Sequence, residues 1–249
     1  ARGLEDRMKK DIRIKKVSAA DMVFDKMKEF ILNGTWPLHE KVPSEGELAE
    51  AFGVNRLTVR IALQRLNALG ILDTRVGDGT YVCSFDFDQH IHEISDFYMS
   101  PGLLEDVTEY RKAIQLECAR LAVKRATEEE LLELRSCCER FEKELDRYYT
   151  LTDPEKARES FIATVDIGLD FHTQLFKMAH NQLLGYSFSI AKGPIRLHMQ
   201  RNASSRLNDR GSDQVNIWTK TYWAIYKAVE DRDYEECARQ LKRLIASED

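Results

Sequence analysis

The sequence predicts a mainly α-helical fold: an N-terminal winged helix-turn-helix with a small β-hairpin wing, then a C-terminal antiparallel helical bundle. Residues 43–82 hold two capped helical patterns and a glycine-tipped hairpin pattern. From residue 103 onward, apolar residues recur at helical spacing and no strand pattern occurs. The chain has 249 residues, 43% of them hydrophobic, which is enough for two domains with separate cores.

The first helix of the predicted pair begins at Ser44. Glu47 follows three residues later, so the hydroxyl and the carboxylate can cap the first turn reciprocally. Gly53 ends this helix, and Asn55 offers a side-chain oxygen to the free amides of the next one. The spacing is that of a helix-turn-helix.

The second helix of the pair has an apolar face and a polar face. The apolar positions at helical spacing are Val59, Ala62, Leu63, Leu66 and Leu69. Arg56, Arg60 and Gln64 fall on another face. A guanidinium group can donate two hydrogen bonds to guanine, and a Gln amide can bond adenine on two atoms. We therefore expect Arg56 and Arg60 to read bases, with Gln64 beside them.

A wing is predicted directly after this helix. Two short strand patterns flank Gly77 and Gly79, where glycine permits positive backbone dihedrals and a close approach to phosphate. Thr58 and Ser44 are placed to bond phosphate oxygens, which fixes register. A solvated helical hairpin is the alternative for residues 44–69 alone, and the wing favours double-stranded DNA instead. The predicted DNA-binding residues are Ser44, Asn55, Arg56, Thr58, Arg60, Gln64, Arg75, Gly77 and Gly79.

This region resembles the GntR family of bacterial winged-helix regulators. The resemblance covers about residues 19–82 and rests on the Pro-Ser-Glu entry, the Val-Asn-Arg-Leu-Thr-Val-Arg segment and the Gly-Asp-Gly-Thr wing. It implies base or phosphate contacts by Arg56, Thr58, Arg60 and the wing at Gly77. Gly46 stands where relatives often carry an arginine that contacts DNA, so we expect a correspondingly different operator.

Charge is unevenly distributed along the chain. Residues 1–84 carry 14 Lys and Arg against 12 Asp and Glu, and the remainder carries 23 against 30. The asymmetry predicts that nucleic acid binds at the N-terminal end. Because the positive excess there is small, binding by charge alone should be weak, and specificity must come from shape and base contacts. The predicted organisation is a flexible basic tail at 1–17, a winged helix-turn-helix domain at 18–84, a linker at 85–102 and an all-helical effector-binding and dimerisation domain at 103–249.

The C-terminal pattern predicts about six helices. Breaks fall near residue 127 and at 152–154, 180–181, 202–213 and 231–233. In the linker, Asp86, Asp88, His90 and His92 alternate like metal ligands. Because such alternation on an exposed linker is more often solvated charge, no metal site is predicted there.

The C-terminal region resembles the FadR-type effector domain, the all-helical FCD partner of one GntR subfamily. The segments that carry the resemblance are residues 109–117, 169–172, 181, 228–233 and 238. It implies a cavity in the bundle for a small organic acid or acyl ligand, and a homodimer on a pseudo-palindromic site. Dimerisation also follows physically, because one helix in one groove rarely gives useful affinity.

Many members of that subfamily hold a divalent metal, with an Asp four residues before the position of His172 and two later histidines. The equivalent positions here are Gly168, Tyr222 and Leu244, which are poor ligands. Asp166 and Asp170 lie about 200° around the helix from the expected acidic position and do not substitute. We therefore predict no metal and no cofactor.

Without a metal ion, a carboxylate ligand needs another positive partner. Arg111 and Arg196 are the candidates, with His172, Asn181 and Tyr222 as hydrogen-bonding partners. Each has a purely structural alternative: Arg111 can pair with an acidic neighbour, and His172 and Tyr222 can belong to the core.

These observations predict a ligand-responsive DNA-binding regulator, a repressor, and no enzyme. No apolar run approaches the ~20 residues that span a bilayer and no signal peptide is visible, so a cytoplasmic protein without a membrane partner is expected. Five cysteines without Cys-x-x-Cys spacing suit reduced thiols. Two alternatives stay open: a helical-bundle enzyme with a DNA-targeting head, using His172 and Asp170 as acid and base, and a ligand-independent DNA-binding dimer.

Overall fold

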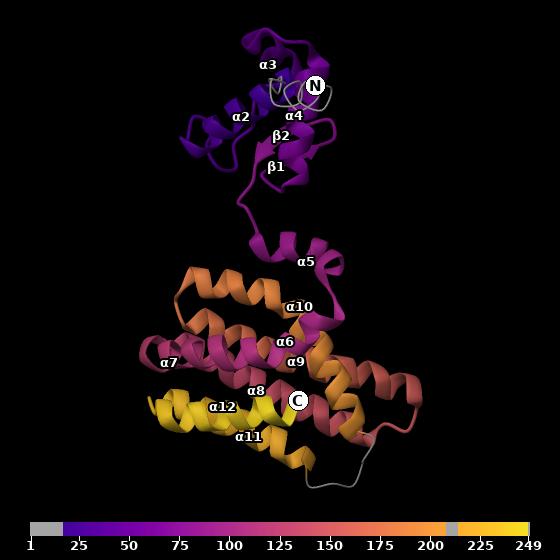
Figure 1. Ribbon diagram of the computed structural model, residues 1–249, viewed down its shortest axis with the longest axis vertical. Helices are drawn as coiled ribbons and strands as arrows, with labels where there is room; N and C mark the ends of the chain where they lie inside the picture. The colour runs from indigo at the N-terminus through magenta and orange to yellow at the C-terminus, as the bar shows by residue number, and fades with distance from the viewer. Residues whose placement is uncertain (1–16, 208–213, 249) are drawn as a thin grey trace, which may run out of the picture. The chain divides into compact units, whose positions relative to one another are not determined.

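The computed structural model describes residues 17–207 and 214–248. The chain divides into two units between Asp86 and Phe87. Helices dominate both, and a two-stranded antiparallel hairpin is the one sheet among the described residues (Figure 1). The predicted mainly α fold is confirmed. The tail predicted at residues 1–17 lies outside the described residues except for its last position.

The N-terminal unit, called the head below, contains three helices and the hairpin. Its elements are α2 (Ala19–Leu32), α3 (Glu45–Phe52), α4 (Arg56–Ala68), β1 (Leu72–Arg75) and β2 (Gly79–Val82). Ser44 Oγ accepts a hydrogen bond from the Glu47 amide at 3.3 Å, and the Ser44 amide donates to the Glu47 carboxylate at 2.8 Å. Gly53 ends α3 with φ 65°. The predicted helix boundaries are therefore confirmed.

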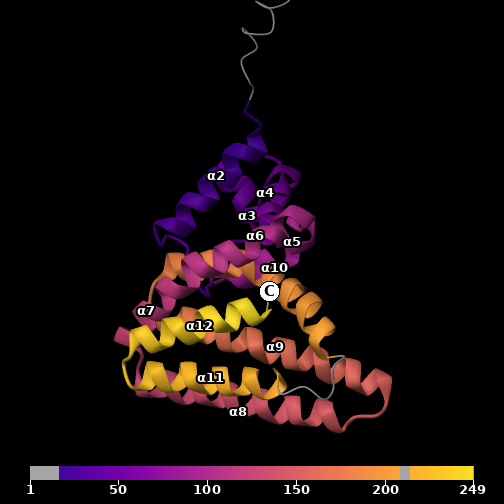
Figure 2. The ribbon, with the colours of Figure 1, turned by 60° about the horizontal axis from the view of Figure 1, so that its bottom comes forward.

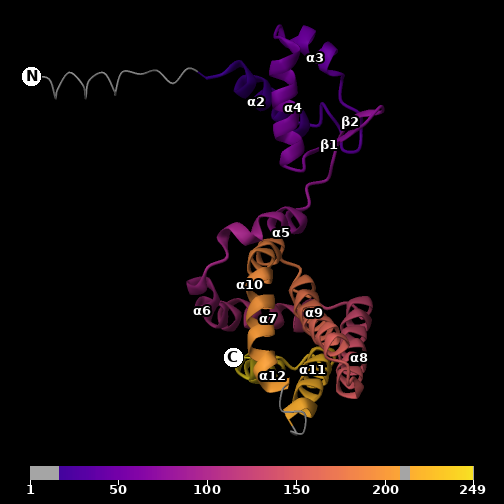
Figure 3. The ribbon, with the colours of Figure 1, turned by 90° about the vertical axis from the view of Figure 1, so that its right-hand side faces the viewer.

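The core of the head lies where α2, α3, α4 and the hairpin meet, and Figure 3 shows the hairpin beside α4. The side chains of Met27, Val59 and Leu66 are fully buried. The predicted apolar face of α4 is confirmed at four positions and wrong at Leu69. That residue is the C-cap of α4 and is 39% exposed, because the chain leaves the helix there.

The C-terminal unit, called the bundle below, is entirely helical over its described residues. Its elements are α5 (Phe87–Tyr98), α6 (Pro101–Tyr110), the π-helical segment η1 (Arg111–Gln115), α7 (Leu116–Arg125), α8 (Glu128–Thr150), α9 (Pro154–Met178), α10 (Gln182–Leu207), α11 (Gln214–Glu230) and α12 (Tyr234–Glu248). Because α6, η1 and α7 are continuous, they form one long helical segment, and the described residues from 101 onward form six such segments, in agreement with the about six helices predicted.

Most predicted helix breaks are confirmed. Thr127 caps α8, Asp153 caps α9, and residues 180–181 and 231–233 lie between helices. The break expected at 202–213 begins later, because α10 continues to Leu207 and residues 208–213 lie outside the described residues. Most of the linker expected at 85–102 is also helical, since α5 occupies its centre and packs on α10.

The main core of the bundle lies among α7, α8, α9, α11 and α12 (Figure 2). Short loops make α8 antiparallel to α9 and α11 antiparallel to α12. Fully buried side chains such as Leu134, Leu175 and Leu241 fill the space between them. None of the described helices combines the length and apolar character that a bilayer crossing requires.

Candidate nucleic-acid interface and bundle sites

Arg60 is held by a carboxylate from the neighbouring helix. Its Nε lies 2.9 and 3.1 Å from the two Glu45 oxygens, and Nη2 lies 2.7 Å from Oε2. These hydrogen bonds raise the pKa of Arg60 and lower the pKa of Glu45. The guanidinium stays about half exposed. Glu45 therefore orients an arginine that still faces solvent.

Arg56 lies against the backbone of α3. A Cβ atom at Gly46 would lie 3.3 Å from Arg56 Nη2 and 3.7 Å from Arg56 Cζ. The missing side chain at residue 46 thus leaves the space that the Arg56 guanidinium occupies. The departure at Gly46 noted in the sequence therefore has a structural counterpart in the position of Arg56.

A groove of about 840 Å³ runs between the start of α3, helix α4 and the wing. It contains four of the residues predicted to bind DNA, namely Ser44, Arg60, Gln64 and Gly79. Asn67 donates to Thr74 Oγ1 at 2.8 Å and so ties α4 to the wing. Lys41 Nζ donates to the backbone carbonyl of Asp78, which lies in the turn between β1 and β2.

Gly79 is required where Lys41 crosses the wing. Its φ of 145° lies in a region that side chains rarely adopt, and a Cβ there would collide with the Lys41 stem. Neither Lys41 nor Glu45 was among the predicted site residues. No local signal marks Lys41, because only the fold brings it to the wing. Glu45 stands next to a recognisable cap, yet the pattern does not reveal its pairing with Arg60.

The other predicted DNA-binding residues lie outside the groove. Asn55 Oδ1 accepts from the Thr58 amide at 2.8 Å and from the Thr58 hydroxyl at 3.0 Å, so this pair caps α4. Arg75 bonds Asp73 at 3.1 Å, with its guanidinium 4.3 Å from the centre of the Tyr81 ring. Gly77 occupies the exposed wing tip with φ 78°.

In the bundle, Arg111 and His172 meet in a buried cluster with Gln115. Arg111 Nη2 lies 3.1 Å from His172 Nε2, and Arg111 Nε donates to Gln115 Oε1 at 3.3 Å. The Gln115 amide contacts His172 Nδ1. All three residues are at most 1% exposed. Arg111 and Gln115 are the two ends of η1, and such π-helical turns are often found at functional sites.

Tyr222 closes the other side of this cluster. Its ring centre lies 4.6 Å from that of Phe171 and 6.2 Å from that of His172. A Cβ atom at Gly168 would lie 2.8 Å from the Tyr222 hydroxyl oxygen. The tyrosine therefore occupies the space into which a side chain at residue 168 would project.

These side chains do not fit a divalent metal. Gly168 has no donor, Leu244 is a buried alkyl group, and both ring nitrogens of His172 contact other side chains. Tyr222 is the remaining equivalent position, and a neutral phenol is a poor ligand. Over the residues that the structure describes, no group of three His, Cys, Asp or Glu side chains is arranged to hold a metal ion.

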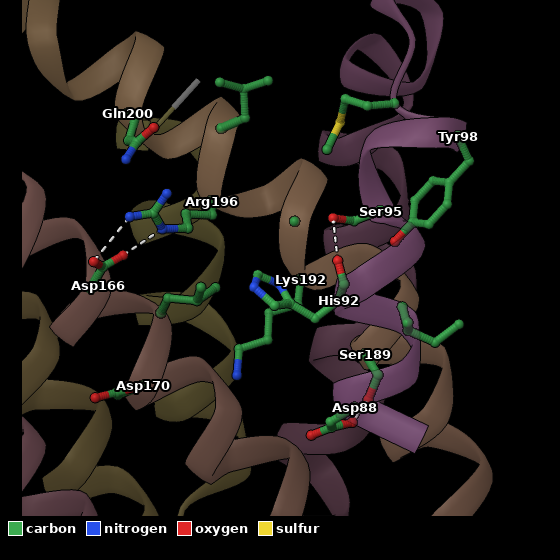
Figure 4. Close-up of a pocket in the computed structure, with 15 residues that line it drawn as sticks. Asp88, His92, Ser95, Tyr98, Asp166, Asp170, Ser189, Lys192, Arg196 and Gln200 are labelled. Carbon is green, nitrogen blue, oxygen red and sulfur yellow. Dashed lines mark hydrogen bonds and ion pairs between the residues drawn. The ribbon is translucent and has the colours of Figure 1, made fainter. Parts of the chain in front are cut away.

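Two predicted effector residues lie apart from this cluster. Arg196 on α10 forms a two-pronged ion pair with Asp166 at 2.5 and 3.0 Å (Figure 4). Asn181 accepts from the Leu184 amide at 3.2 Å and caps the start of α10. The five residues predicted as one set are thus divided: Arg111, His172 and Tyr222 meet, whereas Arg196 and Asn181 do not join them.

Comparison with known proteins assigns a family model to each unit. Residues 19–82 match the model described as bacterial regulatory proteins, gntR family, and residues 106–247 match the FCD domain model. LutR of Bacillus subtilis, an HTH-type transcriptional regulator, is 28% identical over 190 residues, which cover 76% of this chain and 75% of LutR. The Glc operon transcriptional activator of Escherichia coli is 25% identical over 169 residues, or 67% of this chain and 63% of that protein.

A solved structure supports the fold. Streptococcus agalactiae GntR superposes with a TM-score of 0.65 and 21% sequence identity, covering 92% of this chain and 97% of that one. At this identity, the likeness shows a shared fold.

Proposed function

The chain belongs to the gntR family of bacterial regulatory proteins and carries an FCD domain, and from this premise we propose that it is a dimeric repressor controlled by a small organic acid. Family membership makes it an HTH-type transcription regulator with an effector-binding domain, and not an enzyme. Repression is proposed because a head bound to an operator that overlaps a promoter excludes RNA polymerase without any further protein contact.

The Arg60–Glu45 pair is the observation that carries the proposed mode of DNA binding. An arginine that reads a base in the major groove must direct its planar guanidinium group at the edge of a guanine. Glu45 limits the orientations of that fork while leaving it accessible to solvent. The adjacent groove, with Ser44 and Lys41 on its walls, suits one phosphate backbone.

We propose that the homodimer forms through an apolar face on α5 and α10. These helices pack together, and several large apolar side chains on them remain exposed. The exposed fractions are Phe97 91%, Leu183 79%, Ile190 47%, Ile94 39% and Tyr186 36%. Large exposed apolar side chains on two helices that pack together are typical of an interaction surface, and a second copy supplies the second head that a pseudo-palindromic operator needs. Ile190→Glu is expected to yield a monomer in light scattering, whereas Leu132→Glu, an exposed site on α8, is expected to leave the dimer intact.

We place the effector at the cluster of Arg111, His172 and Tyr222. A guanidinium beside an imidazole and a phenol can bind a carboxylate by charge-assisted hydrogen bonds. The same residues are at most 2% exposed, so a ligand must part them to enter. This closure is the observation that favours a second candidate, a dimer that binds DNA without an effector.

The DNA-binding proposal is tested on a duplex selected in vitro with the wild-type protein. Arg60→Ala is expected to weaken binding of that duplex by about tenfold or more, which is the range of one two-pronged base contact. Arg65→Ala is the matched control, because Arg65 on the same helix pairs with Asp21 of α2. Unchanged binding by Arg60→Ala together with loss in Gln64→Ala would contradict the assignment of the base reader.

Thermal unfolding distinguishes the two candidates for the bundle. A ligand that binds only the folded state must raise the melting temperature. We expect a shift with at least one class among organic acids, sugar acids and acyl compounds, and no shift by that compound in Arg111→Lys. No shift with any class would support the ligand-independent dimer.

A further inference from the structure

A cavity in the bundle lies between α5 and the helices α9 and α10, and its lining does not include the Arg111 cluster. Its volume is about 590 Å³, which is within the usual range for small-molecule sites. Helix α5 contributes Ile91 and Ser95 to its lining, and Met99 follows directly after this helix. This helix falls between the two matched family models, which end at residue 82 and begin at residue 106.

Each acidic side chain around this cavity has a hydrogen-bond partner. Asp166 is bonded by Arg196 at 2.5 and 3.0 Å, and Asp170 is bonded by Arg140 at 3.2 Å. Asp88 accepts a hydrogen bond from the Ser189 hydroxyl. Asp166 and Asp170 thus have arginine partners, whereas Asp88 has a neutral hydroxyl donor.

Lys192 differs from these groups. Its side chain is half-buried, and it forms no ion pair within the ranges 17–207 and 214–248. Figure 4 shows its amino group pointing into the space between the helices. A half-buried ammonium in a cavity is best stabilised by an anionic ligand.

The remaining walls indicate what is attached to that anion. Ile91, Met99, Leu169 and Leu197 line the cavity with alkyl and thioether groups. The Ser95 hydroxyl, which donates to the His92 carbonyl at 2.9 Å, keeps an oxygen able to accept, and the Gln200 amide adds a donor. We propose that this cavity binds a small amphipathic monocarboxylate, with Lys192 on the carboxylate and the apolar side chains around its short alkyl chain.

Such a ligand would bridge α5 and the helices α9 and α10. Side chains of α5 form one wall, and side chains of α9 and α10 form the other (Figure 4). A ligand that contacts both walls stabilises only the state in which α5 is packed on α10. Only residues 83–86 separate strand β2 of the wing from α5. Occupancy of this cavity therefore controls how firmly α5, which leads to the head, is held against α9 and α10.

Sodium hexanoate is the probe for this site, with 1-hexanol and hexylamine as neutral and cationic controls of the same length. In calorimetry, hexanoate is expected to bind the full-length protein, and Lys192→Met to weaken it by about tenfold or more. Lys192→Gln keeps a hydrogen-bond donor without the charge and is expected to give a similar loss. Lys156→Met, an exposed lysine on α9 far along the helix, is the control and should bind normally.

Hydrogen exchange gives the second readout. Hexanoate is expected to slow amide exchange in residues 87–98 of the wild type and to leave it unchanged in Lys192→Met. Binding that survives both Lys192 variants, tighter binding of hexanol or hexylamine, or no protection of α5 would each overturn the proposal. If Arg111→Lys abolishes hexanoate binding while Lys192→Met retains it, the carboxylate occupies the buried cluster, and the proposed effector site stands while this one fails.

Discussion

The head and the bundle contain the same local capping motif, but its role differs between the two units. Both contain a reciprocal cap, formed by Ser44 and Glu47 in the head and by Thr127 and Glu130 in the bundle. In the head, the capped turn borders the groove that we assign to DNA. In the bundle, it begins a long core helix, and the Glu130 carboxylate also lies 2.7 Å from His180 Nε2. A motif recognised in sequence therefore reports local structure, and its role depends on what the fold places next to it.

The arginine side chains of the two units differ in exposure and in partners. Arg60 is about half exposed and is oriented by a carboxylate at the surface, whereas Arg111 is fully buried against His172. The head presents its charge to a polyanion from a segment of about 40 contiguous residues, 43–82. The bundle assembles its cluster from helices that are distant in sequence.

The largest expected effects test whether the two cores are independent. Leu66→Ala removes a fully buried side chain from the head and is expected to cost about 2–5 kcal/mol of stability in that unit. Leu241→Ala is the equivalent change in the bundle. Native-state hydrogen exchange should show lost protection in α4 for the first variant and in α12 for the second.

Leu69→Ala, at the C-cap of the helix that contains Leu66, is the control, because Leu69 is 39% exposed and its removal opens no cavity. If Leu66→Ala lowers protection equally in α4 and α12, the two units unfold together and their cores are not independent.

The sequence predicted the head in more detail than the bundle, for physical reasons. Caps and turns depend on residues three or four apart, so Ser44, Gly53 and Asn55 mark their boundaries without knowledge of the fold. The pairing of Glu45 with Arg60 spans 15 residues, and that of Arg111 with His172 spans 61. Such contacts depend on packing, which periodicity alone does not determine.

Two further features of the bundle had no sequence signal of their own. The π-helical turn at 111–115 places Arg111 and Gln115 on the same histidine, although an ordinary helical pattern covers this stretch. The mixed aromatic and polar residues of α5 predict a linker rather than a helix. Its structure comes from packing on α10, a segment about 100 residues later.

The next effect concerns Gly168, at the position where the resemblance to the FadR-type domain implies an acidic metal ligand. Gly168→Ala places a Cβ 2.8 Å from the Tyr222 hydroxyl and 3.1 Å from Met199 Cε, so we expect a loss of about 1–3 kcal/mol in chemical denaturation. In a Tyr222→Phe background, the clashing oxygen is absent and the loss should shrink. Gly185→Ala is the matched control in α10, since no atom lies within 4 Å of its added Cβ.

Gly185→Ala should be neutral or stabilising, because alanine favours helix. An equal loss for Gly168→Ala with and without the Tyr222 hydroxyl would show that the hydroxyl does not fill this space.

A smaller effect separates the roles of the two reciprocal caps. Ser44→Ala and Thr127→Ala each remove a capping oxygen, which costs about 0.5–2 kcal/mol. Both variants should lower the denaturation midpoint by similar amounts. Only Ser44→Ala is expected to weaken DNA binding as well, because Ser44 lines the groove beside Arg60. Anisotropy titrations that found equal DNA affinity for the two variants would remove Ser44 from the interface.

The smallest expected effect concerns the orientation of Arg60 by Glu45. Glu45→Gln keeps one oxygen that accepts from the Arg60 guanidinium. It removes the negative charge and the second oxygen that together hold Arg60 Nε and Nη2. Removing a negative charge near phosphates should strengthen binding to random duplexes, while a less oriented arginine should weaken discrimination among bases. We therefore expect the ratio of operator to random-duplex affinity to fall, although neither affinity changes greatly. Glu50→Gln, on the same helix outside the groove, is the control. A ratio that rises in Glu45→Gln would mean that the carboxylate withholds Arg60 from DNA rather than aiming it.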